Sequence, residues 1–273
     1  MWGHRKSCVC GKVNRMCNQF RTLQQPHLFE SHFGVSKPTG EWRDDVYPDY
    51  VAPIVRRPRG GRPGARESVL AKFGLVPAAS KTGKRELSTM NARDDRVRTA
   101  RSYKGPFRER QWCIIPAERF YEPLYDLDQW AAGSRRSERF AIQRFDQQPM
   151  GIAGIWEIWK RHPDDDDRVT SFSMLTINAD IHPLLHRFHR PFDNQGKPEE
   201  KRTVVLLGEA EYDAWLDCSP GNAFDFFHSF AAEELVAASC PEPPRTKKPK
   251  VEESIEPNDS IGAVQQQLGL DFG

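Results

Sequence analysis

Cys17 directly follows Met16, and a cysteine in this position gains a second nucleophile if the chain starts at Met16 or is cut after it. An N-terminal cysteine carries an α-amine with a pKa of about 8 beside a thiol with a pKa of about 8.5, so both groups can attack a carbonyl carbon near neutral pH. In an internal cysteine the amine is part of a peptide bond. Taken alone, these two residues favour a simpler interpretation, a buried structural cysteine near a first strand.

Three other side chains are of types that transfer protons or orient a substrate. Asn91 follows Met90, Glu122 ends an apolar segment that begins at Gln111, and His189 stands directly before Arg190-Pro191. Each also has an ordinary structural role, because an asparagine caps turns, a glutamate pairs with arginines and a histidine packs on surfaces. Singly, none of the three predicts a catalytic site.

Charge is nearly balanced, but it is unevenly distributed. The 40 basic and 38 acidic residues leave a formal net charge of +2, which does not by itself indicate a polyanion partner. Arginine and lysine crowd the segment from Arg56 to Arg110, whereas acidic residues concentrate in Asp164 to Asp167 and in the tail. This pattern predicts a basic face on an almost neutral protein.

The cysteines and the hydropathy limit the class of protein. The 6 cysteines are scattered and form no CxxC pair, so we expect neither a metal site nor a cofactor. No run of about 18 apolar residues occurs, which excludes a membrane-spanning helix. We therefore expect a soluble protein of a reducing cytoplasm.

The chain divides into three regions. Residues 1–15 are basic and lack periodicity, and they are expected to be a leader that is absent from the mature protein. Residues 16–238 form the predicted domain. Apolar patterning ends after about Leu235, and residues 239–273 are proline-rich and charged, as is typical of a disordered tail.

Within the domain many short strands and few helices are expected. Helices are predicted over 26–33, ending near Gly34, and over 209–216. Strands are predicted at 54–55, 69–77, 111–121, 140–142, 152–159, 172–177 and 203–207. This composition indicates an α+β fold with a mainly antiparallel sheet or open barrel and flanking helices.

Seven short motifs follow one another along the chain. They are Met16-Cys17-Asn18, Phe73-Gly74-Leu75-Val76-Pro77, Met90-Asn91-Ala92-Arg93, Cys113 to Glu122, Ala153-Gly154-Ile155-Trp156-Glu157, Met174 to Ala179 and Phe188-His189-Arg190-Pro191. In this order they resemble the SOS response-associated peptidase (SRAP) family, over about residues 16–235. The resemblance implies the SRAP fold and covalent capture of abasic sites in single-stranded DNA, after self-processing that exposes the cysteine. It also implies a bacterial protein that associates with the nucleoid at sites of damage.

Site residues are implied by the same resemblance. Cys17 is the crosslinking nucleophile, its amine and thiol together forming a thiazolidine with the sugar aldehyde. Glu122 is the proton shuttle, Asn91 positions the cysteine amine or the sugar, and His189 is the matching histidine, with His186 as the alternative. The family more often has glycine and arginine after the cysteine, where this chain has Asn18 and Gln19.

Partners follow from the resemblance and from the tail. Arg93, Arg101 and Thr176 are the predicted DNA contacts, and aromatic residues such as Phe73 are candidates for stacking on bases. The segment 267–272 resembles peptides that dock on the bacterial β sliding clamp. Its predicted clamp-binding residues are Gln267, Leu268, Leu270 and Phe272.

The leading prediction is therefore a self-processing, peptidase-like enzyme that shields abasic sites, with possible lyase activity at them. A non-covalent single-strand binding module with a structural cysteine is the alternative, in which Arg93 and Arg101 supply electrostatic affinity. A protease acting on other proteins is a third interpretation. Covalent capture separates the first from the other two.

Overall fold

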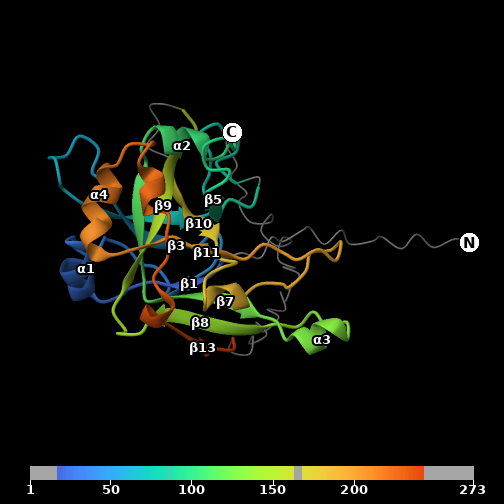
Figure 1. Cartoon of the computed structure of the whole chain (residues 1–273). Helices are drawn as coiled ribbons and strands as arrows, with labels where there is room; N and C mark the ends of the chain where they lie inside the picture. The colour runs from blue at the N-terminus through green and yellow to red at the C-terminus, as the bar shows by residue number, and fades with distance from the viewer. Residues whose placement is uncertain (1–16, 86, 163–167, 243–273) are drawn as a thin grey trace, which may run out of the picture. The chain divides into compact units, whose positions relative to one another are not determined.

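The computed structural model of the protein describes residues 17–85, 87–162 and 168–242 (Figure 1). The predicted leader, Met16, the acidic turn and the clamp-binding segment all lie outside the described residues. Among the described residues, every helix is too short or too polar to cross a lipid bilayer.

Two sheets carry the described chain. The smaller has five strands in the order β13 (Leu235–Ser239), β8 (Glu138–Arg144), β7 (Arg119–Leu124), β1 (Phe20–Arg21) and β2 (Asp45–Val46). The larger has eight strands, β11 (Arg202–Val204), β10 (Arg168–Asn178), β4 (Glu67–Phe73), β3 (Val51–Arg56), β6 (Trp112–Ala117), β9 (Met150–Lys160) and β12 (Leu206–Leu207), with β5 (Asn91–Arg93) beside β10.

The larger sheet closes on itself. Strand β10 pairs with β4 on one side and with β9 on the other, so β10, β4, β3, β6 and β9 form a continuous ring of hydrogen-bonded strands. Nearly all pairings are antiparallel; β10 runs parallel to β4 and to β5. The α+β prediction with a mainly antiparallel sheet or barrel is therefore confirmed.

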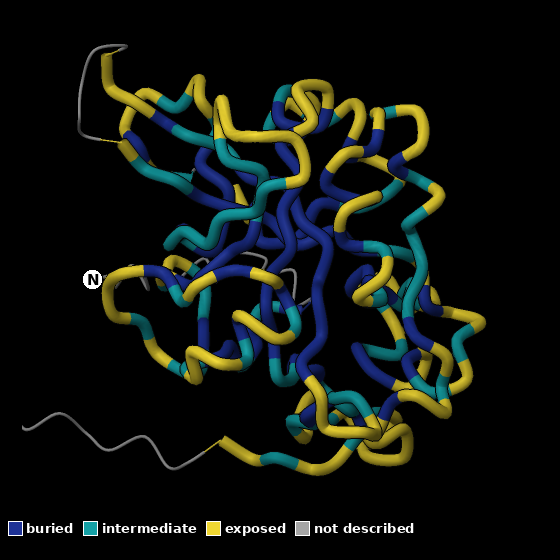
Figure 2. The backbone as a smooth tube through the Cα atoms, turned by 90° about the vertical axis from the view of Figure 1, so that its left-hand side faces the viewer, coloured by how far each residue is buried: buried dark blue, intermediate teal, exposed yellow. Residues whose placement is uncertain are grey.

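Alternating side chains of the larger sheet enter two separate cores. On β6, Cys113 and Ile115 join a cluster shared with Phe20 and Phe120 of the smaller sheet. Ile114 between them points to the opposite face, because successive residues of a strand alternate in direction. In Figure 2 the strands at the centre are buried and the connecting loops exposed, so both faces of the sheet are covered.

Helices cover the second face. They are α1 (Pro26–Phe33), α2 (Lys104–Arg108) and α4 (Tyr212–Asp217), which all contribute buried side chains to the second core. Helix α3 (Leu127–Ala131) has no buried residue and lies at the end of β8 in the smaller sheet (Figure 1). Helix α1 ends at Gly34, whose φ of 65° is the left-handed conformation that glycine adopts without strain. Phe33 of α1 stacks on Tyr212 of α4, with ring centroids 5.4 Å apart.

Two predicted elements differ from those observed. The single strand expected over 111–121 is two strands, β6 and β7, because the chain crosses between the sheets at Glu118, whose N–H donates to the Arg21 carbonyl at 2.8 Å. The helix expected over 209–216 begins as a 3-10 turn, Glu209–Glu211, before α4. Phe73 is fully buried, so it packs in the core and offers no face for stacking on a base.

Candidate functional site

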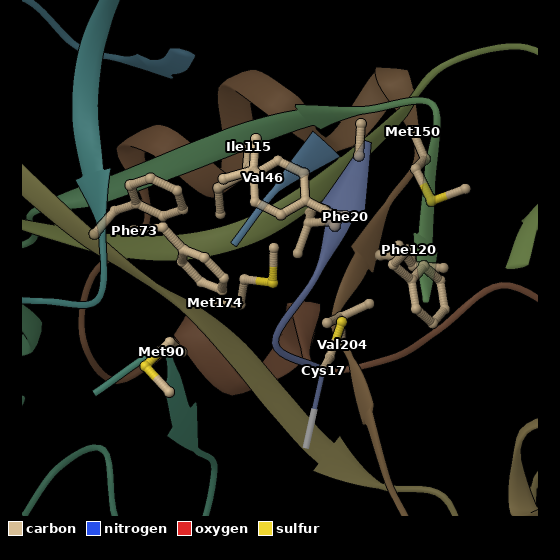
Figure 3. Close-up of a cluster of buried hydrophobic side chains, with 14 of the residues drawn as sticks. Cys17, Phe20, Val46, Phe73, Met90, Ile115, Phe120, Met150, Met174 and Val204 are labelled. Atoms are coloured by element: carbon tan, nitrogen blue, oxygen red, sulfur yellow. The ribbon is translucent and has the colours of Figure 1, made fainter. Parts of the chain in front are cut away.

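Cys17 lies just before β1, inside the core that the two sheets share. Its exposed fraction is 2%, and it belongs to the same buried cluster as Phe20 and Val204 (Figure 3). The Tyr121 N–H donates to the Gln19 carbonyl at 3.0 Å, which continues the pairing of β1 with β7 towards Cys17. The first described residue of the chain is thus held beside the strand that carries Glu122.

Asn91 fixes the backbone at Cys17. Its Nδ2 donates to the Cys17 carbonyl at 3.1 Å and to Oδ1 of Asn18 at 3.2 Å. Asn91 begins β5, which is held against β10 with Asn91 opposite Met174, and its own carbonyl accepts a hydrogen bond from the Tyr103 hydroxyl at 3.0 Å. The amide that orients Cys17 is therefore itself held from two sides.

Glu122 and His189 form a buried pair next to the cysteine. Nε2 of His189 lies 3.3 Å from Oε2 of Glu122, with side-chain exposed fractions of 7% and 3%. The same Nε2 lies 2.8 Å from the Arg202 carbonyl, which can only accept, so Nε2 carries a hydrogen. That hydrogen is directed to the Arg202 carbonyl, and the Glu122 carboxyl group lies beside it.

The backbone of His189 is held in an uncommon conformation. Its φ is 68°, in the left-handed region that costs a non-glycine residue about 1–2 kcal/mol. The His189 N–H donates to the Pro123 carbonyl at 2.8 Å, directly after Glu122. Nζ of Lys201 donates to the Arg190 carbonyl at 2.5 Å and lies 3.4 Å from that of His189. These contacts hold the ring against Glu122.

Burial favours the protonated form of both acidic groups of the site. Desolvation raises the pKa of the Cys17 thiol well above its usual value, and the neighbouring Glu122 carboxyl raises it further. Desolvation likewise raises the pKa of Glu122, while the Cys17 thiol partly offsets the rise. A neutral carboxylic acid can donate a proton and take one back, which is what a proton shuttle requires.

Several polar atoms around Cys17 lack a hydrogen bond of ordinary geometry within the described part of the chain. They are both carboxyl oxygens of Glu122, Oδ1 of Asn91 and Nε2 of Gln19. Buried polar atoms are nearly always satisfied in folded proteins, and exceptions mark sites where a ligand or water completes the bonding. Donors and acceptors for a polar substrate are therefore present at this site.

The two candidate histidines lie in different environments. His186 is exposed and its Nδ1 lies 2.7 Å from the carbonyl of His182, one turn earlier. His189 is buried against Glu122. The geometry favours His189, which stays the predicted catalytic histidine.

Of the three predicted DNA contacts, Arg93 and Thr176 lie opposite each other on β5 and β10, whereas Arg101 lies in the turn before α2. Both Asp95 and Glu200 bind the guanidinium of Arg93, at 2.9 and 2.7 Å. Arg101 is exposed and lines a different part of the surface. The Thr176 side chain is buried and its Oγ1 lies 3.4 Å from Nη2 of Arg202. Direct DNA contacts by these residues stay predictions.

Arg202 is a site residue that the sequence pattern did not reveal. Its guanidinium is buried with Asp94 at 2.6 Å and Glu200 at 2.8 Å, and its carbonyl positions the His189 ring. The sequence did contain an indication of this role, because an arginine at the start of a buried strand requires carboxylate partners. The described residues contain no group of three or more side chains suited to hold a metal ion.

Replacing Glu122 by glutamine is expected to raise the melting temperature at pH 8 and to change it little at pH 4. Because the folded pKa of Glu122 is raised, the stability due to its neutral form is full below the unfolded pKa of about 4.3 and is lost as the pH rises towards the folded value. Because glutamine does not ionise, the variant does not lose this stability as the pH rises. Each kcal/mol gained corresponds to about 2–4 °C.

Thermal melts of both proteins from pH 4 to pH 8 measure this difference. Glu233→Gln, at an exposed position before β13, is the control, and it should show no widening gap. A gap between Glu122→Gln and wild type that stays constant across this range would contradict a buried neutral carboxyl at position 122.

Comparison with known proteins identifies the family that the chain matches and proteins that resemble it. Residues 16–241 match the family described as SOS response associated peptidase (SRAP). The chain is 22% identical to "Abasic site processing protein HMCES" of Rattus norvegicus, over 54% of this chain and 44% of that protein. It is 24% identical to the protein of the same name from Pongo abelii, over 65% and 56%. The chain thus spans about half the length of these relatives.

Solved structures share the fold. A protein from Bordetella bronchiseptica superposes with a TM-score of 0.70 at 29% identity, over 82% of this chain and 99% of that one. A protein from Bacteroides thetaiotaomicron superposes with a TM-score of 0.60 over 82% and 91%, and at 17% identity it shows the fold alone. With the family match extending over both sheets, the chain belongs to the SOS response associated peptidase (SRAP) family.

Proposed function

We propose that the protein captures abasic sites in single-stranded DNA covalently, with Cys17 as the N-terminal residue of the mature chain. The observation that carries this proposal is the convergence of Cys17, Asn91, Glu122 and His189 from four separate segments on one buried site. Two relatives named for abasic site processing support it, as does a family match that begins at residue 16.

The chemistry uses both nucleophiles of one residue. The ring-opened sugar of an abasic site is an aldehyde, and the Cys17 amine condenses with it to an imine, releasing one water. The thiol sulfur then bonds to the imine carbon, while the thiol proton passes to the nitrogen. A five-membered thiazolidine results, and because the second step is intramolecular it gains a large effective concentration.

The surrounding residues match the steps that need proton transfer. A neutral Glu122 can protonate the departing hydroxyl during dehydration and recover a proton from the thiol, with which it interacts. His189 carries a hydrogen on Nε2 beside the same carboxyl group and can protonate the sugar ring oxygen as the ring opens. Asn91 holds the Cys17 carbonyl and so orients the amine on the same residue.

Self-processing belongs to the same proposal. The amine becomes a nucleophile only when every residue before Cys17 has been removed, so cleavage after Met16 is the peptidase activity that the site requires. Such an activity needs no external protein substrate. Because the reaction passes through an imine, we also expect lyase activity at the captured sugar.

A denaturing gel tests the proposal. Protein that begins at Cys17 is incubated with a uracil-containing single strand treated with uracil glycosylase, then heated in detergent. A retarded band is expected only with the treated strand. A non-covalent binding module would bind both strands in native gels and give no band after denaturation, and that result would overturn the proposal.

Replacing His189 by glutamine is expected to slow crosslinking about 10- to 100-fold, because a glutamine amide keeps an N–H donor but cannot transfer its proton. His186→Gln is the matched control and should leave the rate within about twofold, since its ring faces solvent. Initial rates on an abasic oligonucleotide measure both. If His186→Gln were the slower variant, the roles assigned to the two histidines would be reversed.

A further inference from the structure

A pocket of about 410 Å³ lies apart from the polar cluster at Cys17, between the loop after β4 and the turn before α2. Ligand pockets in proteins commonly have volumes of about 300–1,000 Å³. The charged residues of its described lining are all cationic: Lys81, Lys84 and Arg101. Ser80, Thr89 and Ser102 are the polar uncharged residues of the lining, and because every charged residue is a cation the pocket is suited to an anion.

The three cations have no carboxylate partner within the described residues, whereas Arg93 has two. No ion pair joins Lys81, Lys84 or Arg101 to an acidic side chain in that part of the chain. A phosphate arriving at Arg93 must compete with Asp95 and Glu200. At the pocket it meets cations without a carboxylate partner among the described residues, so the electrostatic gain from binding an anion is larger there.

The loop that carries the two lysines is anchored to β9. The Trp159 indole N–H donates to the Ser80 carbonyl at 2.6 Å, and the Ser80 hydroxyl donates to the Lys84 carbonyl at 2.9 Å. Gly83 has a φ of 68°, and a Cβ there would lie 2.6 Å from the Trp159 ring. A side chain at position 83 would push the loop away, so glycine allows the close packing that places Lys81 and Lys84 on either side.

The pocket is close to the proposed covalent site. Thr89 lines the pocket, and Asn91, which binds the Cys17 carbonyl, is two residues further along the chain. Two residues span at most about 7 Å. The Thr89 hydroxyl donates to the Leu75 carbonyl at 2.7 Å, and the Ser173 hydroxyl donates to the Thr89 carbonyl, so this connection is held in place.

We infer that this pocket binds a phosphodiester of the DNA strand that flanks the abasic nucleotide, with Lys81, Lys84 and Arg101 as its ligands. The inference rests on the proposed function, because the strand's position is set by the sugar at Cys17. It assigns the main electrostatic affinity for the strand to this pocket and not to Arg93. Lys81 and Lys84 lie outside the motifs by which the family was identified.

The salt dependence of binding tests the assignment. Affinity for an intact 12-residue oligodeoxythymidine is measured at increasing salt for wild type, for Lys81→Gln/Lys84→Gln, and for the triple variant that adds Arg101→Gln. Each phosphate contact contributes about 0.7 to the slope of log affinity against log salt, so losing the one phosphodiester held by the pocket should shrink the slope by up to about 0.7, most fully in the triple variant. Lys81→Arg/Lys84→Arg should retain the wild-type slope.

Arg62→Gln/Arg136→Gln is the charge-matched control, since both arginines are exposed and lie outside the pocket lining. Its slope should equal that of wild type, and a lysine variant no different from this control would overturn the inference. Thymidine monophosphate should compete only at concentrations far above that of the oligonucleotide; equal competition would assign the pocket to free nucleotides instead.

The denaturing gel distinguishes a failure of the pocket assignment from a failure of the proposed covalent capture. At saturating abasic strand and low salt, the double lysine variant should still crosslink to completion. A wild-type protein that binds with the expected slope but never crosslinks would leave the pocket assignment intact and refute covalent capture.

Discussion

Protein beginning with Cys17→Ala is expected to form no adduct that survives heat and detergent, a loss of at least about a thousandfold. The amine of alanine can still form an imine, but without a thiol no ring closes, and the imine hydrolyses on denaturation. Adding borohydride before denaturation should restore a band by reducing the imine. Cys240→Ala, which removes a half-buried thiol at the end of the domain, should crosslink like wild type.

A chain that keeps residues 1–16 tests whether the free α-amine of Cys17 is required. A chain that retains residues 1–16 has its Cys17 nitrogen in a peptide bond and should form no adduct with or without borohydride. A heat-stable band from such a chain, shown by mass to be uncut, would mean that another residue is the nucleophile.

Glu122→Gln is expected to slow crosslinking about 100-fold while leaving strand binding unchanged. Glutamine matches the neutral carboxyl in shape but cannot release or accept a proton, so dehydration and ring closure lose their shuttle. The wild-type rate should fall as the pH rises through the raised pKa of Glu122, because the protonated form is the acid. The variant should lack this fall.

Glu157→Gln is the matched control for that experiment. Burial also raises the pKa of Glu157, but this carboxyl lies on β9 and contacts Gln111. Its removal should leave the rate within about twofold. Equal losses in the two variants would show that general destabilisation, and not proton transfer at position 122, limits the reaction.

Local patterns predicted the elements that local interactions determine. Helix α1 has the bounds expected from its apolar spacing and from Gly34, because the helix stop depends on neighbours in sequence. The division of 111–121 was missed, because an apolar run does not reveal that β6 and β7 belong to different sheets. What divides them is the hydrogen bond from Glu118 to Arg21, almost a hundred positions earlier.

The same distinction holds at the site. Cys17, Asn91, Glu122 and His189 were predicted as residue types in order, but no spacing predicts that Nδ2 of Asn91 binds the Cys17 carbonyl. Nor does the sequence reveal that Arg93 is neutralised by Glu200, since that pairing depends on strands brought together by folding. Burial, and with it the raised pKa of Glu122, is likewise a tertiary property.

The intact mass of the conjugate tests covalent capture by Cys17 most directly. Protein expressed from its native start is reacted with an abasic oligonucleotide. The intact mass of the conjugate is then measured by mass spectrometry before and after borohydride treatment. The predicted mass is that of a chain beginning at Cys17 plus the oligonucleotide less one water, unchanged by borohydride because a thiazolidine has no C=N bond to reduce. A conjugate that retains residues before Cys17, or one that gains two hydrogens on reduction, would contradict the thiazolidine at this residue.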